Sequence, residues 1–171
     1  MNNLWSPWRS KYIESLKDED KKKPRECFFC DAYSKTENSR ELLVVARSQN
    51  CFVMMNKFPY NNGHLLIAPN LHLAELEDLS EEVLAEIMFV IRKAKKVLEK
   101  VFVPHGFNIG LNLGRVAGAG VPGHLHFHIV PRWNGDTNFM PVLSEVKVIS
   151  QSLEDTQEMI SNVWKELYGG G

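Results

Sequence analysis

Hydrophobic and polar residues recur along the chain with two periods, one typical of strands and one of helices. Short apolar or alternating runs, bounded by Gly, Pro, Asn and Asp, predict β-strands. The first two runs are separated by four polar residues, 47–50, and so predict a hairpin. His64 opens the third run, and Pro131 is expected to end the last one. The predicted strands are 42–46, 51–55, 65–68, 107–113 and 123–131.

Two longer stretches have apolar residues at three- and four-residue steps, which predicts amphipathic helices. The first is capped by Asp78 or Ser80, continues with two glutamates that suit the positive end of a helix dipole, and stops at Pro104. The second covers 153–168. We expect the apolar stripe of the first helix to face the core: Leu84, Ile87, Met88, Ile91, Ala94, Leu98 and Val101.

These elements together predict an α+β fold in which helices cover an antiparallel sheet. The 171 residues suffice for one hydrophobic core, and the sequence contains no internal repeat. We therefore expect a single domain over 1–171, in which 1–25 form an N-terminal arm and a charged linker.

The charge balance narrows the classes of ligand. Basic and acidic residues nearly cancel, giving a net charge of −1, so a long nucleic acid would find no basic footprint. A small anion stays possible, because local donors rather than net charge would bind it. No apolar run reaches the roughly 20 residues that cross a bilayer, and 1–5 lack the features of a signal peptide. We expect a cytoplasmic protein without a membrane segment.

Three histidines, His124, His126 and His128, alternate with apolar residues within the last predicted strand. In an extended chain their imidazoles share one face, where they either hold a metal or include a nucleophile or acid–base group. Neighbouring side chains on one face stand about 6.5–7 Å apart, which is poor geometry for three ligands of one ion. A nucleophilic middle histidine that attacks phosphorus suits the spacing better. The glycine-rich segment 114–123 could then offer backbone N–H groups to a phosphate.

The cysteines indicate a second chemistry. Three cysteines, two of them in the C-x-x-C motif Cys27–Cys30, favour a metal or redox site over a disulfide framework. This spacing is that of a zinc knuckle, but a closed zinc site needs four ligands. His72 and one histidine of the triad are the available candidates. The alternative is a C-x-x-C that is merely buried or redox-active.

The run 124–130 fits every position of His-φ-His-φ-His-φ-φ, with φ apolar, and on this motif the chain resembles the histidine triad superfamily over nearly its whole length. The resemblance implies a sheet of about five strands with a long helix, paired into a homodimer. It also implies a nucleotide substrate that the middle histidine attacks at the α-phosphate. The implied catalytic residues are His126 as nucleophile, His128 as its orienting partner, and His64 beside them.

The same resemblance implies further ligands. Asn56 matches the position that contacts the ribose hydroxyls, and Asn112 matches the asparagine at the phosphate region. Bacterial members with an N-terminal C-x-x-C hold a structural zinc. The residues that match its ligands are Cys27, Cys30, His72 and His124.

One departure bears on the reaction. Many hydrolases of the superfamily carry a glutamine shortly before the triad, where this chain has Gly120, and its absence leaves room for inorganic phosphate in place of a positioned water. The chain also resembles the bacterial branch that splits diadenosine tetraphosphate with phosphate into ATP and ADP. There, Arg132 and Trp133 are candidate contacts to phosphate and base, with a surface salt bridge and a packed indole as equal alternatives. The alternative functions are a water-using dinucleoside polyphosphate hydrolase, a purine nucleoside phosphoramidase, and a nucleotide-binding module with little turnover.

Overall fold

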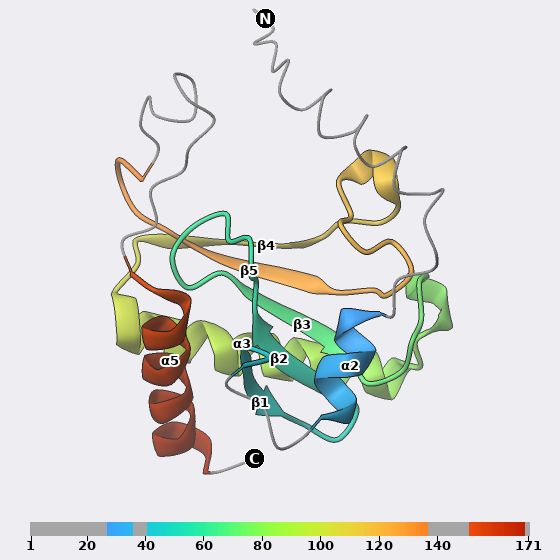
Figure 1. Cartoon of the computed structure of the whole chain (residues 1–171), viewed down its shortest axis with the longest axis horizontal. Coiled ribbons are helices and arrows are strands. Elements are labelled where there is room, and N and C mark those ends of the chain that lie inside the picture. The colour runs from blue at the N-terminus through green and yellow to red at the C-terminus, as the bar shows by residue number, and fades with distance from the viewer. Residues whose placement is uncertain (1–26, 36–40, 137–150, 170–171) are drawn as a thin grey trace, which may run out of the picture. The chain divides into compact units, whose positions relative to one another are not determined.

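The computed structural model describes residues 27–35, 41–136 and 151–169, all of which belong to one compact unit (Figure 1). The predicted arm 1–25 lies outside the described residues, so its role and the prediction of a single domain over 1–171 stay predictions. Among the described residues, no helix combines the length and the apolar character that a membrane crossing requires.

Five antiparallel strands form a single sheet in the order β1-β2-β3-β5-β4. The strands are β1 (Val44–Arg47), β2 (Cys51–Met55), β3 (Leu65–Pro69), β4 (Gly106–Leu111) and β5 (Phe127–Arg132). The pairing of β3 with β5 joins segments that are about 60 residues apart, with Leu66 opposite His128. This confirms the predicted α+β fold on an antiparallel sheet, and all five predicted strands are present.

The last strand differs from its prediction at both ends. β5 begins only at Phe127, so His124 and His126 precede the ladder and only His128 lies within it. At the other end the strand continues through Pro131 instead of stopping there. The carbonyl of Pro131 accepts a hydrogen bond from Asn61, beyond the end of the β3 pairing. An N–H on residue 131 would point to the same side as this carbonyl, where β3 no longer pairs with β5. Proline therefore costs the sheet no hydrogen bond at this position.

Helix α3 (Glu81–Phe102) begins and ends as predicted. The hydroxyl of Ser80 accepts a hydrogen bond from the N–H of Val83, and the chain leaves the helix at Val103 with a φ of 47°, directly before Pro104. The buried stripe is Ile87, Val90, Ile91, Ala94, Val97 and Leu98. The prediction that Met88 belongs to the core is wrong, because its side chain is 58% exposed. Met88 follows the buried Ile87 directly, so its side chain is rotated by about 100° around the helix axis, away from the buried stripe.

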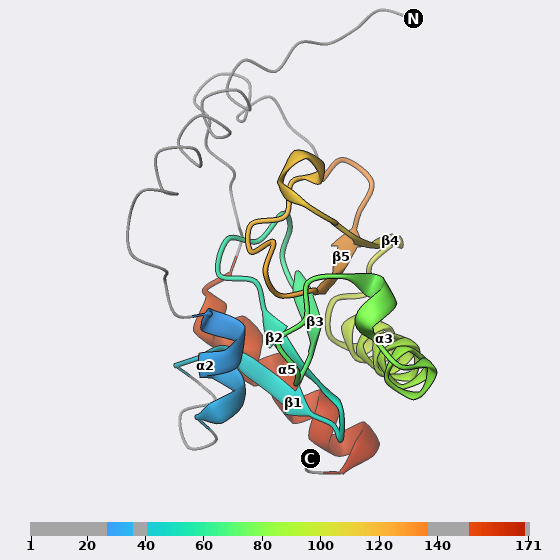
Figure 2. The same cartoon turned by 90° about the vertical axis from the view of Figure 1, so that its right-hand side faces the viewer.

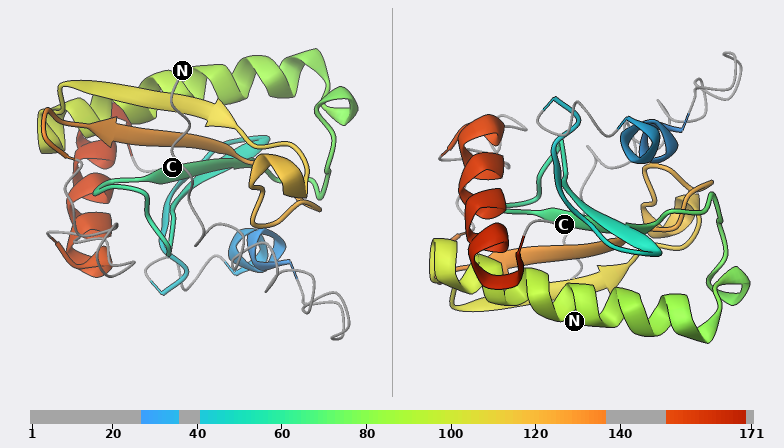
Figure 3. Two further views of the ribbon diagram at one scale, coloured as in Figure 1. Left: turned by 90° about the horizontal axis from the view of Figure 1, so that it is seen from above. Right: turned by 90° about the horizontal axis from the view of Figure 1, so that it is seen from below.

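Helices cover both faces of the sheet (Figures 2 and 3). On one face α3 and α5 (Leu153–Tyr168) enclose the larger hydrophobic core, to which α5 contributes Ile160 and Trp164. On the other face lies α2 (Phe28–Ser34), which buries Phe29 and Ala32 against β2 and β3. The sequence did not predict α2, because seven residues are too few to show a helical period. This second face also carries the histidines.

Candidate active site and metal site

Strand pairing brings two histidines from distant parts of the chain into contact. His64 directly precedes β3, and His128 lies on β5. Their rings meet on the face opposite the larger core, where Nε2 of His64 lies 2.9 Å from Nδ1 of His128. Both side chains are buried. The sequence predicted that these residues belong to one site, and the structure brings them together.

The backbone fixes the position of the proton in this pair. The N–H of Tyr60 donates to Nδ1 of His64 at 3.0 Å, and an N–H can only donate, so Nδ1 carries the lone pair and Nε2 the proton. Nε2 of His64 then donates to Nδ1 of His128, which leaves the proton of a neutral His128 on its Nε2. That atom is buried and has no hydrogen-bond partner among the described residues. His128 therefore presents an unused N–H donor.

His126 presents the opposite group. Its Nδ1 lies 2.8 Å from the backbone oxygen of His124. A carbonyl oxygen only accepts, so Nδ1 carries the proton and Nε2 carries the lone pair. The ring centroids of His126 and His128 are 5.0 Å apart. Two neighbouring rings thus offer a nitrogen lone pair that can attack phosphorus and an N–H that can donate to a phosphate oxygen.

Burial keeps these rings neutral. It lowers the pKa of His126, against a smaller opposing effect of the hydrogen bond to His124. Burial also lowers the pKa of His128 to about 4, with a further contribution from the charge that His126 would carry. Near pH 7 both imidazoles are therefore uncharged, and only an uncharged imidazole has a lone pair for nucleophilic attack.

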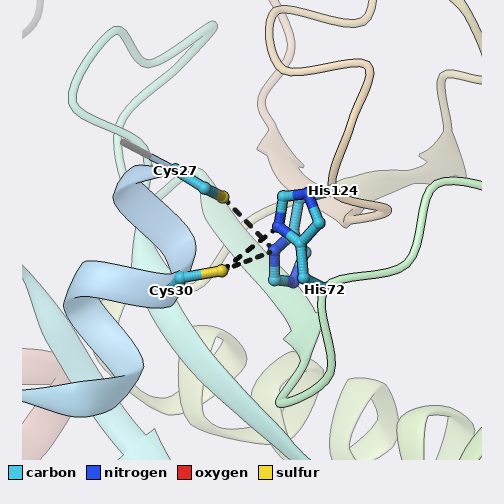
Figure 4. Close-up of side chains that lie close together, drawn as sticks. All are labelled: Cys27, Cys30, His72 and His124. Atoms are coloured by element: carbon cyan, nitrogen blue, oxygen red, sulfur yellow. Dashed lines mark hydrogen bonds between the residues drawn. The ribbon is translucent and has the colours of Figure 1, made fainter. Parts of the chain in front are cut away.

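The described residues contain one group of thiols and imidazoles that could hold a metal ion, Cys27, Cys30, His72 and His124 (Figure 4). Two come from the start of α2, one from the loop after β3, and one from the segment before β5. Their candidate ligand atoms all lie within 4.8 Å of one another. Nδ1 of His124 is 3.4 Å from Sγ of Cys27 and 3.7 Å from Sγ of Cys30, which is 3.2 Å from Nδ1 of His72.

These distances fit a tetrahedral metal. Zinc–sulfur and zinc–nitrogen bonds of about 2.3 and 2.0–2.1 Å at a tetrahedral angle place sulfur and nitrogen about 3.6 Å apart. The far side of His124 is also arranged for ligation, because its Nε2 lies 3.0 Å from the carbonyl oxygen of Pro69. Nε2 therefore holds the proton and Nδ1 faces the thiols. The four residues can bind a metal ion, as predicted.

Of the predicted nucleotide contacts, Asn56 touches His64, Asn112 follows the strand that pairs with β5, and Gly120 is open to solvent. Asn56 accepts the N–H of Phe58 through Oδ1 and places Nδ2 3.3 Å from Nδ1 of His64. Asn112 follows directly after β4, whose register sets Gly110 opposite His128 and thus leads toward His126. Gly120 is exposed, and a Cβ built there would meet no atom within 4 Å.

The other two predicted contacts have partners elsewhere. Arg132 lies four residues beyond His128, about 13 Å along the strand. It binds both carboxylate oxygens of Asp136, at 2.6 and 2.8 Å, and the amide oxygen of Asn108. Trp133 donates its indole N–H to the carbonyl of Phe102 at 3.3 Å. The structure does not bring these two side chains to the histidines, and their contacts are the salt bridge and packed indole of the alternative interpretation.

Two residues at the site were missed from the sequence. Tyr60 supplies the N–H that orients His64, and its ring stacks on His128 with centroids 5.8 Å apart. Phe29 places its ring 4.8 Å from His126 and 5.0 Å from His124. Tyr60 stands in an irregular loop whose pattern carries no sign of this role. For Phe29, its position between the two cysteines was the one feature of the sequence that could have indicated a place at the site.

Comparison with known proteins gives a consistent picture. The family model described as HIT domain matches residues 37–135. AP-4-A phosphorylase of Mycobacterium tuberculosis is 40% identical over 168 residues, covering 96% of this chain and 85% of that protein. The asymmetrical bis(5'-nucleosyl)-tetraphosphatase of Schizosaccharomyces pombe is 32% identical, covering 74% and 68%. A Zn-bound histidine triad family protein of Mycobacterium smegmatis has a similar fold, with a TM-score of 0.66, 24% identity and coverage of 83% and 95%.

Proposed function

The chain belongs to the HIT domain family, and from this premise we propose that it is an enzyme that cleaves diadenosine tetraphosphate with inorganic phosphate to give ATP and ADP. The observation that carries the proposal is the pair formed by the free lone pair on Nε2 of His126 and the unused N–H on Nε2 of His128. The similarity to a phosphorylase of diadenosine tetraphosphate over 96% of the chain supports the substrate.

The first step is a displacement at the α-phosphorus of one adenylyl group. Nε2 of His126 forms a bond to phosphorus, and the bond from phosphorus to the bridging oxygen breaks. The leaving group is ATP, which departs as an anion while its departing oxygen accepts a hydrogen bond from the N–H at Nε2 of the neutral His128. His64 holds His128 in the required orientation and tautomer through the 2.9 Å hydrogen bond. The product of this step is an adenylyl group on His126.

In the second step an oxygen of inorganic phosphate forms a bond to the adenylyl phosphorus, and the bond from phosphorus to Nε2 of His126 breaks. This releases ADP and restores the neutral imidazole of His126, while His128 keeps its proton and donates a hydrogen bond from Nε2. Asn112 and the backbone of the turn around Gly120 are the proposed donors to the phosphate oxygens. The open space at Gly120 supports phosphate as the acceptor, because no side chain there would exclude it. Asn56 is proposed to bind the ribose hydroxyls.

A second candidate function uses water in place of phosphate. The similarity to a tetraphosphatase supports it, and the chemistry at His126 would be unchanged. Incubation of the enzyme with diadenosine tetraphosphate, with and without phosphate, separates the two. Phosphorolysis gives ADP plus ATP and stops without phosphate, whereas hydrolysis gives AMP plus ATP under both conditions. AMP as the main product at saturating phosphate would refute the phosphorylase proposal.

We further propose that the metal held by Cys27, Cys30, His72 and His124 is zinc in a structural role. Two thiolates and two imidazoles form a closed ligand set with no open position for substrate. The metal would supply a crosslink between α2 and the segment that leads into His126. Because thiol ligands persist in a reducing compartment, the site also supports the proposed cytoplasmic location.

A homodimer is the proposed assembly. β4 is an edge strand of the sheet, and Figure 3 shows α3 running beside it. Four large apolar side chains on these two elements and just past β4 are between 42% and 58% exposed, namely Met88, Phe89, Ile109 and Leu113. An unpaired edge flanked by exposed apolar side chains is a surface that a second copy would cover.

A further inference from the structure

One side chain holds the carboxyl end of the short helix α2. Arg47, the last residue of β1, donates through Nη1 to the carbonyl of Tyr33 at 2.8 Å and through Nη2 to the carbonyls of Ala32 and Lys35 at 2.7 and 3.3 Å. Its guanidinium also lies 6.0 Å from the centre of the Tyr33 ring. The polar run 47–50 predicts a turn at Arg47, so the sequence pattern gives no sign of this contact.

This set of hydrogen bonds from Arg47, called the Arg47 clamp below, stabilises a helix that is too short to be stable by itself. A helix of seven residues is marginal by itself, and α2 has no side-chain hydrogen bond at its N-cap, Cys27. The last carbonyls of a helix have no partners within it and carry the negative end of the dipole. The planar, always charged guanidinium of Arg47 satisfies carbonyls there with several donors at once. It fixes both the position of α2 along its axis and its rotation.

The position of α2 matters because the helix touches both sites. At its start it carries the two thiols of the metal site, Cys27 and Cys30. Between them Phe29 is completely buried, and its ring lies against His126 and His124. A shift of α2 would move the thiols relative to His72 and His124. The same shift would loosen the ring that packs against the nucleophile.

We propose that Arg47 is a positioning residue that acts through α2 on both the metal site and His126. This inference rests on the metal site and on the role of His126 proposed above. Arg47 touches neither the proposed substrate site nor a metal ligand, since its contacts are with the carboxyl end of α2. Its effect on catalysis is therefore expected in turnover rather than in substrate binding.

The test compares Arg47→Ala and Arg47→Lys with two controls in the zinc-loaded protein. Lys165→Ala removes the same charge from the exposed side of α5, and Ile160→Val weakens the core on the opposite face of the sheet. For each variant, zinc release to a colorimetric chelator, kcat, KM and the unfolding midpoint are measured. For Arg47→Ala we expect zinc release faster by roughly tenfold and a several-fold lower kcat with KM within twofold. Arg47→Lys, which keeps the charge but not the fork of donors, should fall between.

A purely structural role would give a different pattern. Arg47→Ala would then lower the unfolding midpoint as Ile160→Val does, with zinc release and kcat equal to those of that control, and the inference would be overturned. Zinc release needs no substrate, so it distinguishes the two proposals. If Arg47→Ala releases zinc faster but the wild-type protein shows no phosphorolysis, the proposed function is refuted. The inference that Arg47 positions α2 at the metal site would then still hold. A wild-type chain that retains no zinc would overturn the inference.

Discussion

The backbone oxygen of His124 lies 2.8 Å from Nδ1 of His126, so the residue that turns its own Nδ1 toward two thiols also fixes the tautomer of its neighbour. His124 thus connects the candidate metal site to the proposed nucleophile two residues further along the chain. Through this link the proposed zinc ion, although it has no open coordination position, would influence the proposed reaction. The metal would hold His124 in place, and the carbonyl of His124 keeps the lone pair of His126 on Nε2.

Replacing the nucleophile should stop the reaction without unfolding the protein. We expect His126→Ala to lower kcat by roughly a thousandfold or more, because the substitution removes the nitrogen that forms the bond to phosphorus. The measurement is ATP formation from diadenosine tetraphosphate, with circular dichroism to check the fold. His105→Ala is the matched control, since His105 is exposed and its side chain accepts a hydrogen bond from the N–H of Asn134, in the turn after β5. Normal turnover in His126→Ala would refute the mechanism.

The pH profile should reflect the buried histidines rather than free ones. Burial lowers the pKa of His128 to about 4, so its neutral form, which presents a single N–H, persists well below pH 6.5. An unfolded chain would protonate this histidine near 6.5. The folded state therefore loses the corresponding stability as the pH falls from about 6.5 toward 4.

Because burial lowers the pKa of both His126 and His128, we expect kcat to persist below pH 6.5, where a free histidine is half protonated, and to be lost as the pH approaches 4. Zinc content and circular dichroism, recorded at each pH, separate this titration from loss of metal or of structure. A fall in kcat centred on pH 6.5, with metal and fold intact, would show that His126 and His128 are not both protected from protonation as their burial requires.

The metal site makes its own prediction. The purified chain should contain about one zinc ion, and Cys27→Ser should lose it and unfold at a lower temperature, because a ligand and a crosslink are removed together. Cys51→Ala is the matched cysteine control. Cys51 lies in the core on the other face of the sheet, away from this cluster, so its variant should keep the metal. Chelation that abolishes catalysis at once in a protein of unchanged stability would instead indicate a catalytic metal.

The sequence predicted the elements with long periodic patterns and the sites with rare residue types. Helix α3 followed from its stripe and a cap at Asp78 or Ser80, of which Ser80 is the cap observed. The two cysteines indicated a metal site that needed His72 and one histidine of the triad, and the resemblance to the superfamily implied His124. Helix α2 was missed because it is short, and because tertiary contacts, including the clamp of Arg47, rather than a repeating pattern hold it in place.

Finer features depend on contacts that no local pattern encodes. Met88 fits a helical period but points to the surface, because the buried stripe is narrower than the apolar one. The late start of β5 follows from the segment before it, where the N–H of Leu125 binds the carbonyl of Leu73 rather than a neighbouring strand. The partners of Arg132 depend on the turn that returns Asp136 to it.

The proposed homodimer predicts that charge at the exposed apolar surface separates the subunits. The double variant Met88→Glu/Ile109→Glu should halve the mass measured by light scattering, because two carboxylates would be buried without partners in the interface. Val116→Glu, which changes a fully exposed apolar residue on the turn before β5, should leave the mass unchanged. A wild-type chain that is monomeric at micromolar concentration would contradict the prediction.

Gly120→Gln tests what selects phosphate over water. A Cβ at this position meets no atom within 4 Å, and the backbone there is not in the left-handed region that excludes side chains, so glutamine should fit without strain. Its amide would occupy the space proposed for inorganic phosphate and could orient a water toward the adenylyl group on His126. We expect the ratio of AMP to ADP, measured by chromatography at fixed phosphate, to rise at least several-fold while ATP is still released. Gly120→Ala adds a Cβ without the amide and should keep ADP as the product, so an equal change in both variants would show that bulk alone, and not a positioned water, decides the acceptor.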